Sequence, residues 1–224
     1  MIEKGKSTGI SAHSIENKAD IIVRKSRVED AEKLNELARL CFDPPEIAFT
    51  KKNFENMITR FPEGQICVEY KGKIIGSCSS LIVNIDEYPK HHTLHEISDQ
   101  GYISNHNENG KDLYGIDVIV HPDYRGLKIG KQLYEARKQV CKELHLQSII
   151  FGGRIPNFCS YASSMSAKQY VENVMEGKIY DPVLTFQLRN GFTFKYILPN
   201  YIPEDRESLC NATFMEWRNT EQGE

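Results

Sequence analysis

The chain has 224 residues, a mass of 25.7 kDa and 40% apolar residues, which suffice for one ordinary domain enlarged by insertions. Lysine and arginine number 28 and aspartate and glutamate 31, so the net charge of −3 offers no electrostatic footprint for nucleic acid. Apolar runs stay short of the ~20 residues that cross a membrane, and the polar start lacks the apolar stretch of a secretory signal. The six cysteines form no CxxC pair, so we expect reduced, mostly structural thiols. These features predict a cytoplasmic protein that binds neither nucleic acid nor membrane.

The first half of the chain predicts a strand, two helices and a hairpin. Residues 1–20 are polar and aperiodic, which is typical of a flexible tail. Ser26 and Glu29 form a capping box before the first helix, whose apolar residues repeat at helical spacing. The expected elements are a strand at 21–26, helices at 28–41 and 50–61, and hairpin strands at 65–70 and 73–85.

The second half alternates strands and helices around two insertions, near 86–112 and 153–181. Asp181 and Pro182 suit the N-cap and first position of a helix, and Asn190 with Gly191 suits its end. The expected elements are strands at 113–120, 148–151, 192–198 and 212–217, and helices at 129–144, 166–175 and 182–189. This order predicts one α+β domain over residues 21–219 and a short tail at 220–224.

The most informative segment joins the strand at 113–120 to the helix at 129–144. Such a turn offers free backbone N–H groups and the positive end of a helix dipole to an anion. The segment matches neither the dinucleotide GxGxxG nor the nucleoside-triphosphate GxxxxGK[ST] pattern, so a tight turn without a ligand is the competing interpretation. The candidate phosphate-binding residues are Arg125, Gly126, Leu127, Lys128, Ile129, Gly130 and Lys131.

The pattern V-x-P-x-Y-R-G before this helix resembles the coenzyme A motif of the GNAT N-acetyltransferase superfamily, and the order of elements resembles that family's order. The resemblance implies a GNAT fold, with a central mixed, mostly antiparallel sheet and helices on both faces. It also implies that the loop holds the pyrophosphate of acetyl-CoA, while Val118, Ile119 and Val120 pair with the pantetheine arm. The family's loop has glycine where this chain has Lys128, so the loop departs from the pattern.

Further segments resemble the GNAT domain that precedes a nitrilase-like carbon–nitrogen hydrolase domain in some bacterial proteins. They are RFPEGQICVEYKGKIIG, LYGIDVIVHPDYRGLKIGKQLYEARK, GGRIP, DPVLTFQLRNGF and ILPNY. We expect the GNAT domain to stand alone here, and the resemblance suggests a separate hydrolase of that type as a partner. Edge strands of such sheets often pair, so a homodimer is the default expectation.

Direct attack of an amine on the thioester needs a base for the incoming ammonium and favours an acid for the departing thiolate. Tyr114 stands where several relatives place the base. A free tyrosine has a pKa of about 10, so we expect Tyr114 to orient the acceptor or to relay protons through water. Asp117 is the nearest carboxylate and lies on the opposite face if the strand is regular, with a purely structural role as the alternative.

The resemblance also implies a glutamate at Gly152 and a tyrosine at Gln187, and this chain has neither. Tyr161 or Tyr180 could replace the missing acid. Asn157 matches an asparagine that contacts the coenzyme in relatives.

The first insertion contains His91, His92 and His95, whose spacing allows a metal site. A solvated or substrate-recognising loop is the stronger interpretation, so no metal is expected. Both insertions should border the acceptor site. The carboxylates that could meet an acceptor ammonium there are Glu96, Asp99 and Asp112.

The resulting hypothesis is an acetyl-CoA-dependent N-acetyltransferase acting on a small-molecule or peptide amine. The missing base and acid motivate a first alternative, a catalytically silent acyl-CoA-binding sensor or scaffold. A metal-dependent hydrolase centred on the histidines is the second alternative. The identity of the acceptor and the length of the acyl chain are not readable from the sequence.

Overall fold

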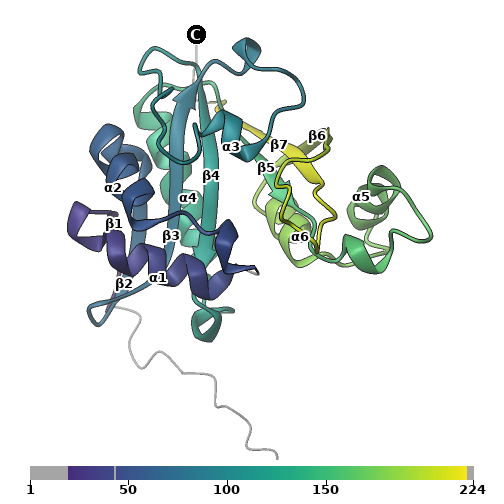
Figure 1. Cartoon of the computed structure of the whole chain (residues 1–224), viewed down its shortest axis with the longest axis horizontal. Helices are drawn as coiled ribbons and strands as arrows, with labels where there is room; N and C mark the ends of the chain where they lie inside the picture. Colours follow the sequence, from purple (N-terminus) through teal and green to yellow (C-terminus); the bar gives the residue numbers. More distant parts are fainter. Residues whose placement is uncertain (1–19, 43, 221–224) are drawn as a thin grey trace, which may run out of the picture.

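The computed structural model describes residues 20–42 and 44–220. Both predicted tails lie outside the described residues, except for Asp20 and Thr220. In the described part, seven strands form one sheet in the order β1-β2-β3-β4-β5-β7-β6 (Figure 1). Only β4 and β5 are parallel neighbours, so the sheet is mixed and mostly antiparallel, as predicted. The strands are β1 (Ile21–Lys25), β2 (Ile66–Tyr70), β3 (Lys73–Val83), β4 (Asp112–Val120), β5 (Ser148–Arg154), β6 (Thr193–Leu198) and β7 (Ala212–Arg218).

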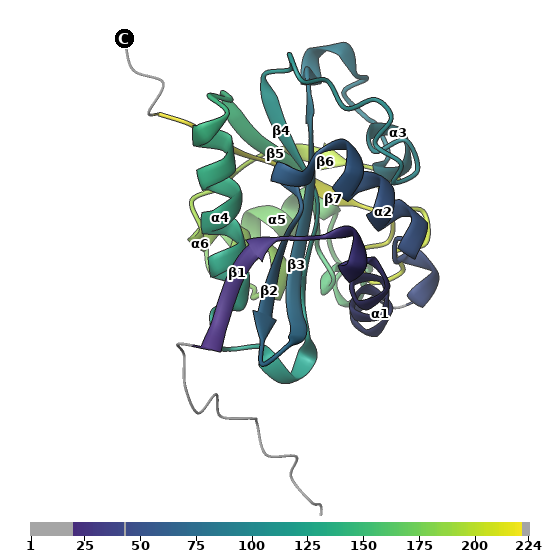
Figure 2. The same ribbon diagram turned by 90° about the vertical axis from the view of Figure 1, so that its left-hand side faces the viewer.

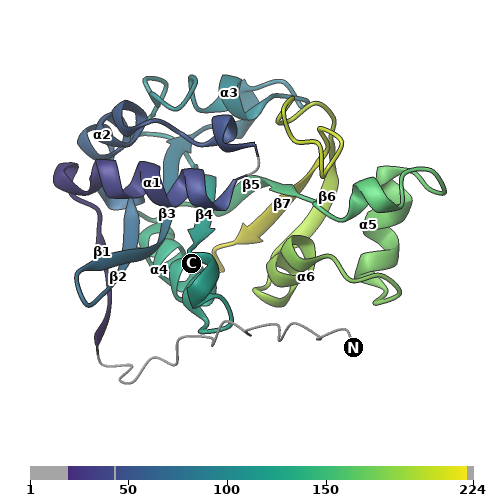
Figure 3. The same cartoon turned by 60° about the horizontal axis from the view of Figure 1, so that its bottom comes forward.

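Helices cover both faces of this sheet, which confirms the predicted architecture. Three of them, α1, α2 and α3, lie on one face, and α4 lies on the other (Figure 2). The last two, α5 and α6, lie at the β5-β7-β6 end, with α5 at its outer side (Figures 1 and 3). The helices are α1 (Ala31–Cys41), α2 (Lys51–Arg60), α3 (Leu94–Ile97), α4 (Ile129–Glu143), α5 (Ala167–Met175) and α6 (Pro182–Arg189).

Local capping explains where the helices begin. Asp181 caps α6 by accepting hydrogen bonds from the N–H groups of Val183 and Leu184, as the sequence predicted. The predicted capping box of Ser26 and Glu29 is wrong. The chain instead enters α1 through a 3-10 turn, Val28–Asp30, because the Asp30 carboxylate accepts from the Arg27 N–H and pairs with Arg24.

The buried face of α4 differs from the predicted apolar stripe. Ile129, Leu133 and Val140 are buried as expected, whereas Leu144 follows the helix and is 38% exposed. Arg137 lies on the buried face and is only 2% exposed. Its side chain donates to the backbone carbonyls of Ser79 and Asp117, which compensates a buried cation with polar partners.

A β-bulge interrupts β4 in the middle of the sheet. Ser79 of β3 lies opposite Asp117, but the next residue, Ser80, lies opposite Gly115, so Ile116 is an extra residue on β4. The regular alternation that was expected to place Tyr114 and Asp117 on opposite faces therefore does not hold. The inserted residue shifts the side-chain parity of β4 beyond Gly115.

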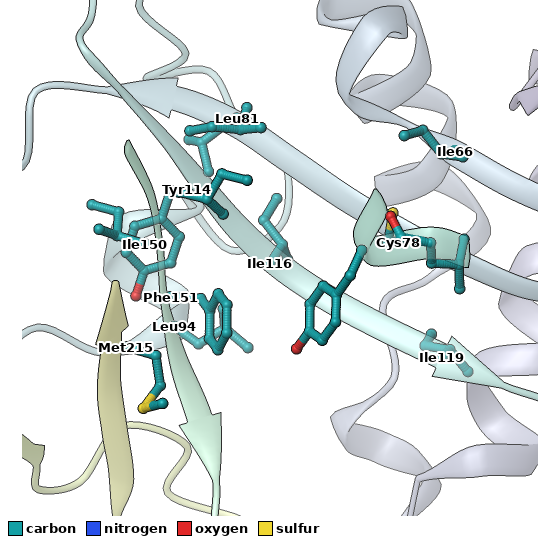
Figure 4. Packing of buried hydrophobic residues seen from close by; sticks show 14 of the residues in the cluster. Ile66, Cys78, Leu81, Leu94, Tyr114, Ile116, Ile119, Ile150, Phe151 and Met215 are labelled. Carbon is teal, nitrogen blue, oxygen red and sulfur yellow. The ribbon is translucent and has the colours of Figure 1, made fainter. Parts of the chain in front are cut away.

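Beyond Tyr114 and Ile150, β4 and β5 diverge. Their parallel pairing covers only Asp112–Tyr114 against Ser148–Ile150, after which β4 pairs with β3 alone and β5 with β7 alone. Figure 4 shows the two ribbons separating past these residues, with the side chains of Ile116 and Phe151 in the opening. The split leaves a free backbone edge on β4, next to the loop that precedes α4.

Candidate active site

The split between β4 and β5 opens into a cavity of about 860 Å³. Residues from β4, the loop before α4, β5, α6, the α1–α2 connection and the β6–β7 connection line it. Because the two strands no longer bond to each other here, the β4 backbone from 116 to 120 can pair with an extended ligand. This is a mode of recognition in which main-chain hydrogen bonds supply affinity.

The loop at one end of the cavity is built as an anion cradle. Gly126 has a φ of +84°, and a Cβ atom there would meet no other atom. Glycine is therefore favoured at this position by the backbone conformation and not by lack of space. The Gln132 N–H donates to the Lys128 carbonyl at 3.1 Å as the first bond that reaches back from α4. The N–H groups of the first three helical residues have no carbonyl partner within the helix. They and the helix dipole favour an anion at this end of the cavity.

Lys128 takes the conformation that glycine would supply. Its φ is +63° and its ψ 19°, in the left-handed region, at the N-cap of α4. A residue with a Cβ pays roughly 1–2 kcal/mol for this conformation. Lysine in place of the family's glycine therefore adds a side chain at the cradle. The backbone keeps the left-handed conformation that glycine adopts freely.

Most of the predicted coenzyme residues border this one cavity. Leu127 does not border it and packs on the core instead. Gly130 lies close to Phe186 of α6, whose ring a Cβ would approach to 3.0 Å. The predicted residues that line the cavity are Val118, Ile119, Val120, Arg125, Gly126, Lys128, Ile129, Gly130, Lys131 and Asn157.

Asn157 lines the cavity and also ties its wall together. Its side chain donates to the Tyr180 carbonyl at 3.1 Å, and its backbone N–H donates to the Asp181 carboxylate at 3.2 Å. The same carboxylate oxygen accepts from the Tyr170 hydroxyl at 2.8 Å. Asp181 thus joins three segments at one edge of the cavity.

The resemblance implies catalytic groups at Gly152 and Gln187, and packing fills the space at both positions. A Cβ on Gly152 would lie 2.3 Å from Cζ of Tyr201, so the Tyr201 ring occupies the space of a side chain at that position. A Cβ on Gly153 would lie 2.4 Å from Oε1 of Gln187, which is 4% exposed and has no hydrogen-bond partner at that oxygen within the described chain. Both glycines are needed for close approach, and neither space is open to a glutamate.

Tyr114 does not border the cavity but joins a buried hydrogen-bonded chain. Its hydroxyl lies 2.9 Å from the Tyr201 hydroxyl and 2.9 Å from Nε2 of His92. Nδ1 of His92 lies 3.0 Å from the Pro89 carbonyl, which can only accept, so Nδ1 carries the hydrogen and Nε2 accepts from Tyr114. All three side chains are at most 2% exposed. Burial raises the pKa of both tyrosines and lowers the pKa of His92. These three side chains are therefore uncharged at neutral pH.

Asp117 is a half-buried residue that lines the cavity. One oxygen accepts from the Ser79 N–H at 2.8 Å, and the other is buried without a partner among the described residues. Burial raises the pKa of Asp117 to about 6, against the opposing charge of Arg137. Its Oδ2 atom is shielded from solvent, although the residue as a whole is half-buried.

The carboxylates predicted to meet an acceptor ammonium have structural roles instead. Glu96 accepts from the Thr93 N–H at the start of α3, Asp99 accepts from the Ser104 hydroxyl, and Asp112 accepts from the Ser148 hydroxyl. None of them lines the cavity. Of the first insertion, only Leu94 reaches it. Tyr180 from the second insertion lines the cavity, whereas Tyr161 packs against Tyr170.

The histidines of the first insertion do not converge. His92 has both ring nitrogens hydrogen-bonded, and His91 contacts the Tyr196 ring edge-on. Across residues 20–42 and 44–220, no group of three or more His, Cys, Asp or Glu side chains is placed to hold a metal ion. A metallohydrolase centred on these histidines has no support in this part of the chain.

The other end of the cavity is apolar with a charged rim. Arg154 of β5 binds Asp205 at 2.6 Å and Glu207 at 3.0 Å, both from the β6–β7 connection. Asp205 is buried and does not line the cavity, whereas Arg154 and Glu207 both line it, so Glu207 is the carboxylate of this rim that faces the cavity. The apolar side chains that line the cavity outside the cradle include Phe42, Ile47, Phe49, Leu94 and Ile202.

The fold and the split cavity define an acyltransferase of the acetyltransferase type. A model of the acetyltransferase (GNAT) family matches residues 31–158, and the chain belongs to this family. The part of the chain that the structure describes has no helix long and apolar enough to cross a membrane.

Two proteins of Bacillus subtilis (strain 168) are similar in sequence. "Uncharacterized N-acetyltransferase YkwB" is 40% identical over 202 residues, which cover 89% of this chain and 89% of YkwB. "Probable hydrolase YhcX" is 50% identical over 201 residues, which cover 90% of this chain and 39% of YhcX. The chain therefore spans well under half the length of YhcX.

Solved structures share the fold at low sequence identity. The loading GNATL domain of CurA from Lyngbya majuscula has a TM-score of 0.79 at 22% identity, covering 88% of this chain and 97% of that domain. The GphF GNAT-like decarboxylase, solved with isobutyryl-CoA, has a TM-score of 0.74 at 20% identity, covering 88% of this chain and 98% of GphF. At these identities the likeness concerns the fold.

Proposed function

We propose that the chain is an acetyl-CoA-dependent N-acyltransferase that transfers an acyl group to a primary amine by direct attack in a ternary complex. The observation that carries the proposal is the coincidence, in one cavity, of a free β4 edge, an anion cradle and an apolar wall beside the exposed Glu207 carboxylate. Each feature matches one part of a reaction between a coenzyme A thioester and an amine.

The residues present suit coenzyme A. The cradle offers backbone N–H groups and the side chains of Arg125, Lys128 and Lys131 to a pyrophosphate. The β4 edge at 117–120 offers alternating N–H and C=O groups to the amides of pantetheine. When bound there, the thioester supplies an activated acyl carbonyl, and a β4 N–H is suited to stabilise the oxyanion that attack creates.

The far end suits an amine on an apolar body. Its apolar wall excludes water, which strengthens the attraction between the rim and a cation. The exposed carboxylate of Glu207 lines the cavity and offers an ammonium a partner of opposite charge. A small molecule or a peptide amine meets these conditions, so both belong in the acceptor screen.

The donor site is tested by titrating acetyl-CoA into the wild type and into Gly126→Val. Valine cannot adopt the φ of +84° without strain, so the cradle should distort and the affinity should fall by tenfold or more. Gly177→Val is the matched control, because Gly177 has a φ of +74° and equally open surroundings but lies outside the cavity. Equal affinities for all three proteins would refute the cradle.

The transfer itself is tested by detecting acylated amines with a labelled acetyl donor. A catalytically silent acyl-CoA sensor is the main rival, favoured by the occupied spaces beside Gly152 and Gly153. It predicts saturable donor binding with no amine-dependent release of coenzyme A. The protein should also be incubated with malonyl-CoA in the absence of amine, because GphF is described as a decarboxylase. Its consumption would favour that reaction over transfer.

Two partner predictions accompany this function. A homodimer is proposed because the exposed apolar residues Ile22 and Val23 lie on the edge strand β1. A separate carbon–nitrogen hydrolase is proposed from the resemblance of the sequence to domains joined to such enzymes. Sedimentation of the purified chain, alone and with a candidate hydrolase, tests both.

A further inference from the structure

A chain of three buried side chains leads from the cavity into the first insertion. Tyr201, from the β6–β7 connection, borders the cavity and covers Gly152. Behind it lie Tyr114 of β4 and then His92 of the insertion, with successive polar atoms 2.9 Å apart. This chain therefore begins where relatives place a catalytic glutamate and ends at a base that the cavity does not reach directly.

We infer that Tyr201, Tyr114 and His92 form a proton relay that removes the proton of the acceptor ammonium, an inference that rests on the proposed function. Tyr201 is the catalytic residue of the relay, because it alone touches the cavity. Tyr114 and His92 act through it and are positioning residues.

The hydrogen bonds fix the direction of the relay. Because Nδ1 of His92 donates to Pro89, Nε2 must accept from the Tyr114 hydroxyl. The Tyr114 oxygen then accepts from the Tyr201 hydroxyl, and the Tyr201 oxygen can accept in turn from the Gly152 N–H or from a donor in the cavity. An ammonium N–H is such a donor.

The proton balance closes over one transfer. An alkyl ammonium, with a pKa of about 10, breaks one N–H bond and gives the proton to Tyr201 Oη. The Tyr201 proton moves to Tyr114 Oη and the Tyr114 proton to His92 Nε2, so both tyrosines are phenols again and His92 becomes an imidazolium. The neutral amine attacks the thioester and its second proton leaves with the coenzyme A thiol. His92 releases its proton to solvent before the next cycle.

The surroundings of His92 act on its protonation in both directions, and the largest effect, burial, disfavours the imidazolium. Aromatic rings contact it on several sides, and burial keeps it neutral until a proton arrives. The exposed carboxylate of Glu96 favours the imidazolium, and the neighbouring His91 opposes it. The titratable groups that face His92 and Tyr114 are Tyr88, His91, Glu96, Tyr196 and Tyr201.

The kinetic test compares Tyr201→Phe, Tyr114→Phe and His92→Gln with the control Tyr196→Phe, which removes a hydroxyl outside the chain. With an alkyl amine, each relay variant should lose about 10²- to 10⁴-fold in kcat, as expected for a lost general base. With an aromatic amine, which is already neutral at pH 7, the loss should be only a few-fold. Affinity for acetyl-CoA should not change. Equal losses on both amines, or no loss, would overturn the relay.

A second measurement separates failure of the relay from failure of the proposed function. Nitrogen-15 NMR of histidine-labelled protein should show His92 with the hydrogen on Nδ1, and Tyr114→Phe should shift its Nε2 resonance. A hydrogen on Nε2 would overturn the relay whatever the activity. Absence of any amine transfer by the wild type would refute the proposed function, and the tautomer would still decide whether the chain can carry a proton in this direction.

Discussion

Replacing Asp117 by asparagine should remove a pH-dependent destabilisation of the fold. Burial raises the pKa of this carboxyl to about 6 from an ordinary value of 3.8. The folded state therefore binds the proton more tightly than the unfolded state, and stability contributed by this group falls as the pH rises from about 4 to about 6. A shift of about 2 pKa units corresponds to about 3 kcal/mol above pH 6.

The asparagine variant has no such titration. Its amide would place an unpaired NH2 group, with two N–H donors, where the second carboxyl oxygen now lies without a partner, which costs about 1–3 kcal/mol at all pH values. We therefore expect Asp117→Asn to be less stable than the wild type at pH 4 and of similar or greater stability at pH 7.5. The prediction concerns how the stability difference between the variant and the wild type changes with pH. The cost of the unpaired amide is the same at every pH, so it does not affect this change.

Urea unfolding at half-unit intervals from pH 4 to pH 7.5 measures this. Other carboxyl groups titrate in the same range, so the quantity to follow is the free energy of unfolding of Asp117→Asn minus that of the wild type. This difference should rise by about 2–3 kcal/mol between pH 4 and pH 7. Asp86→Asn, at an exposed position, is the matched control. A flat or falling difference would refute a carboxyl whose pKa is raised by burial.

Three further substitutions test the site. Lys128→Gly should stabilise the free protein by about 0.5–1 kcal/mol, because relief of the left-handed conformation exceeds the extra unfolded-state entropy of glycine, and an unchanged urea midpoint would contradict this. Arg154→Met should destabilise the fold at pH 7 by about 3–5 kcal/mol, since it leaves the Asp205 carboxylate buried and unpaired; the loss should shrink at acidic pH as Asp205 protonates. A loss independent of pH would argue against an ionised Asp205. Gly152→Ala should cost about 1–3 kcal/mol in thermal or urea unfolding and lower kcat, because the new Cβ displaces the Tyr201 ring; a variant with wild-type stability would show that the ring moves freely.

The proposed donor site could be predicted from the sequence, because its residues are neighbours along the chain. The turn before α4, its glycine and its cations follow one another within seven residues, 125–131, and the helix that they precede has a clear apolar period. The sequence could not show whether Lys128 keeps the shape of the turn. In the structure its left-handed backbone continues the turn where glycine was expected.

The proposed relay could not be predicted in the same way, because its residues are distant in sequence. His92 lies 22 residues before Tyr114, and Tyr201 lies 87 residues after it. Sequence patterns could identify the histidine-rich insertion but not the tyrosine hydroxyl that it meets. The bulge at Ile116 also shifts the side-chain parity of β4, and it leaves no signature in an apolar strand. The buried Arg137 was hidden for a related reason, because an amphipathic helix can bury a cation where backbone carbonyls receive it.

Initial-rate kinetics with donor and acceptor varied together test the central claim most directly. Direct transfer in the split between β4 and β5 requires both substrates to be bound at once, so double-reciprocal plots should intersect and coenzyme A should appear only with an amine present. Parallel lines, with coenzyme A released before the amine binds, would contradict direct transfer. They would indicate an acyl-enzyme, for which Cys41 is the thiol that borders the cavity.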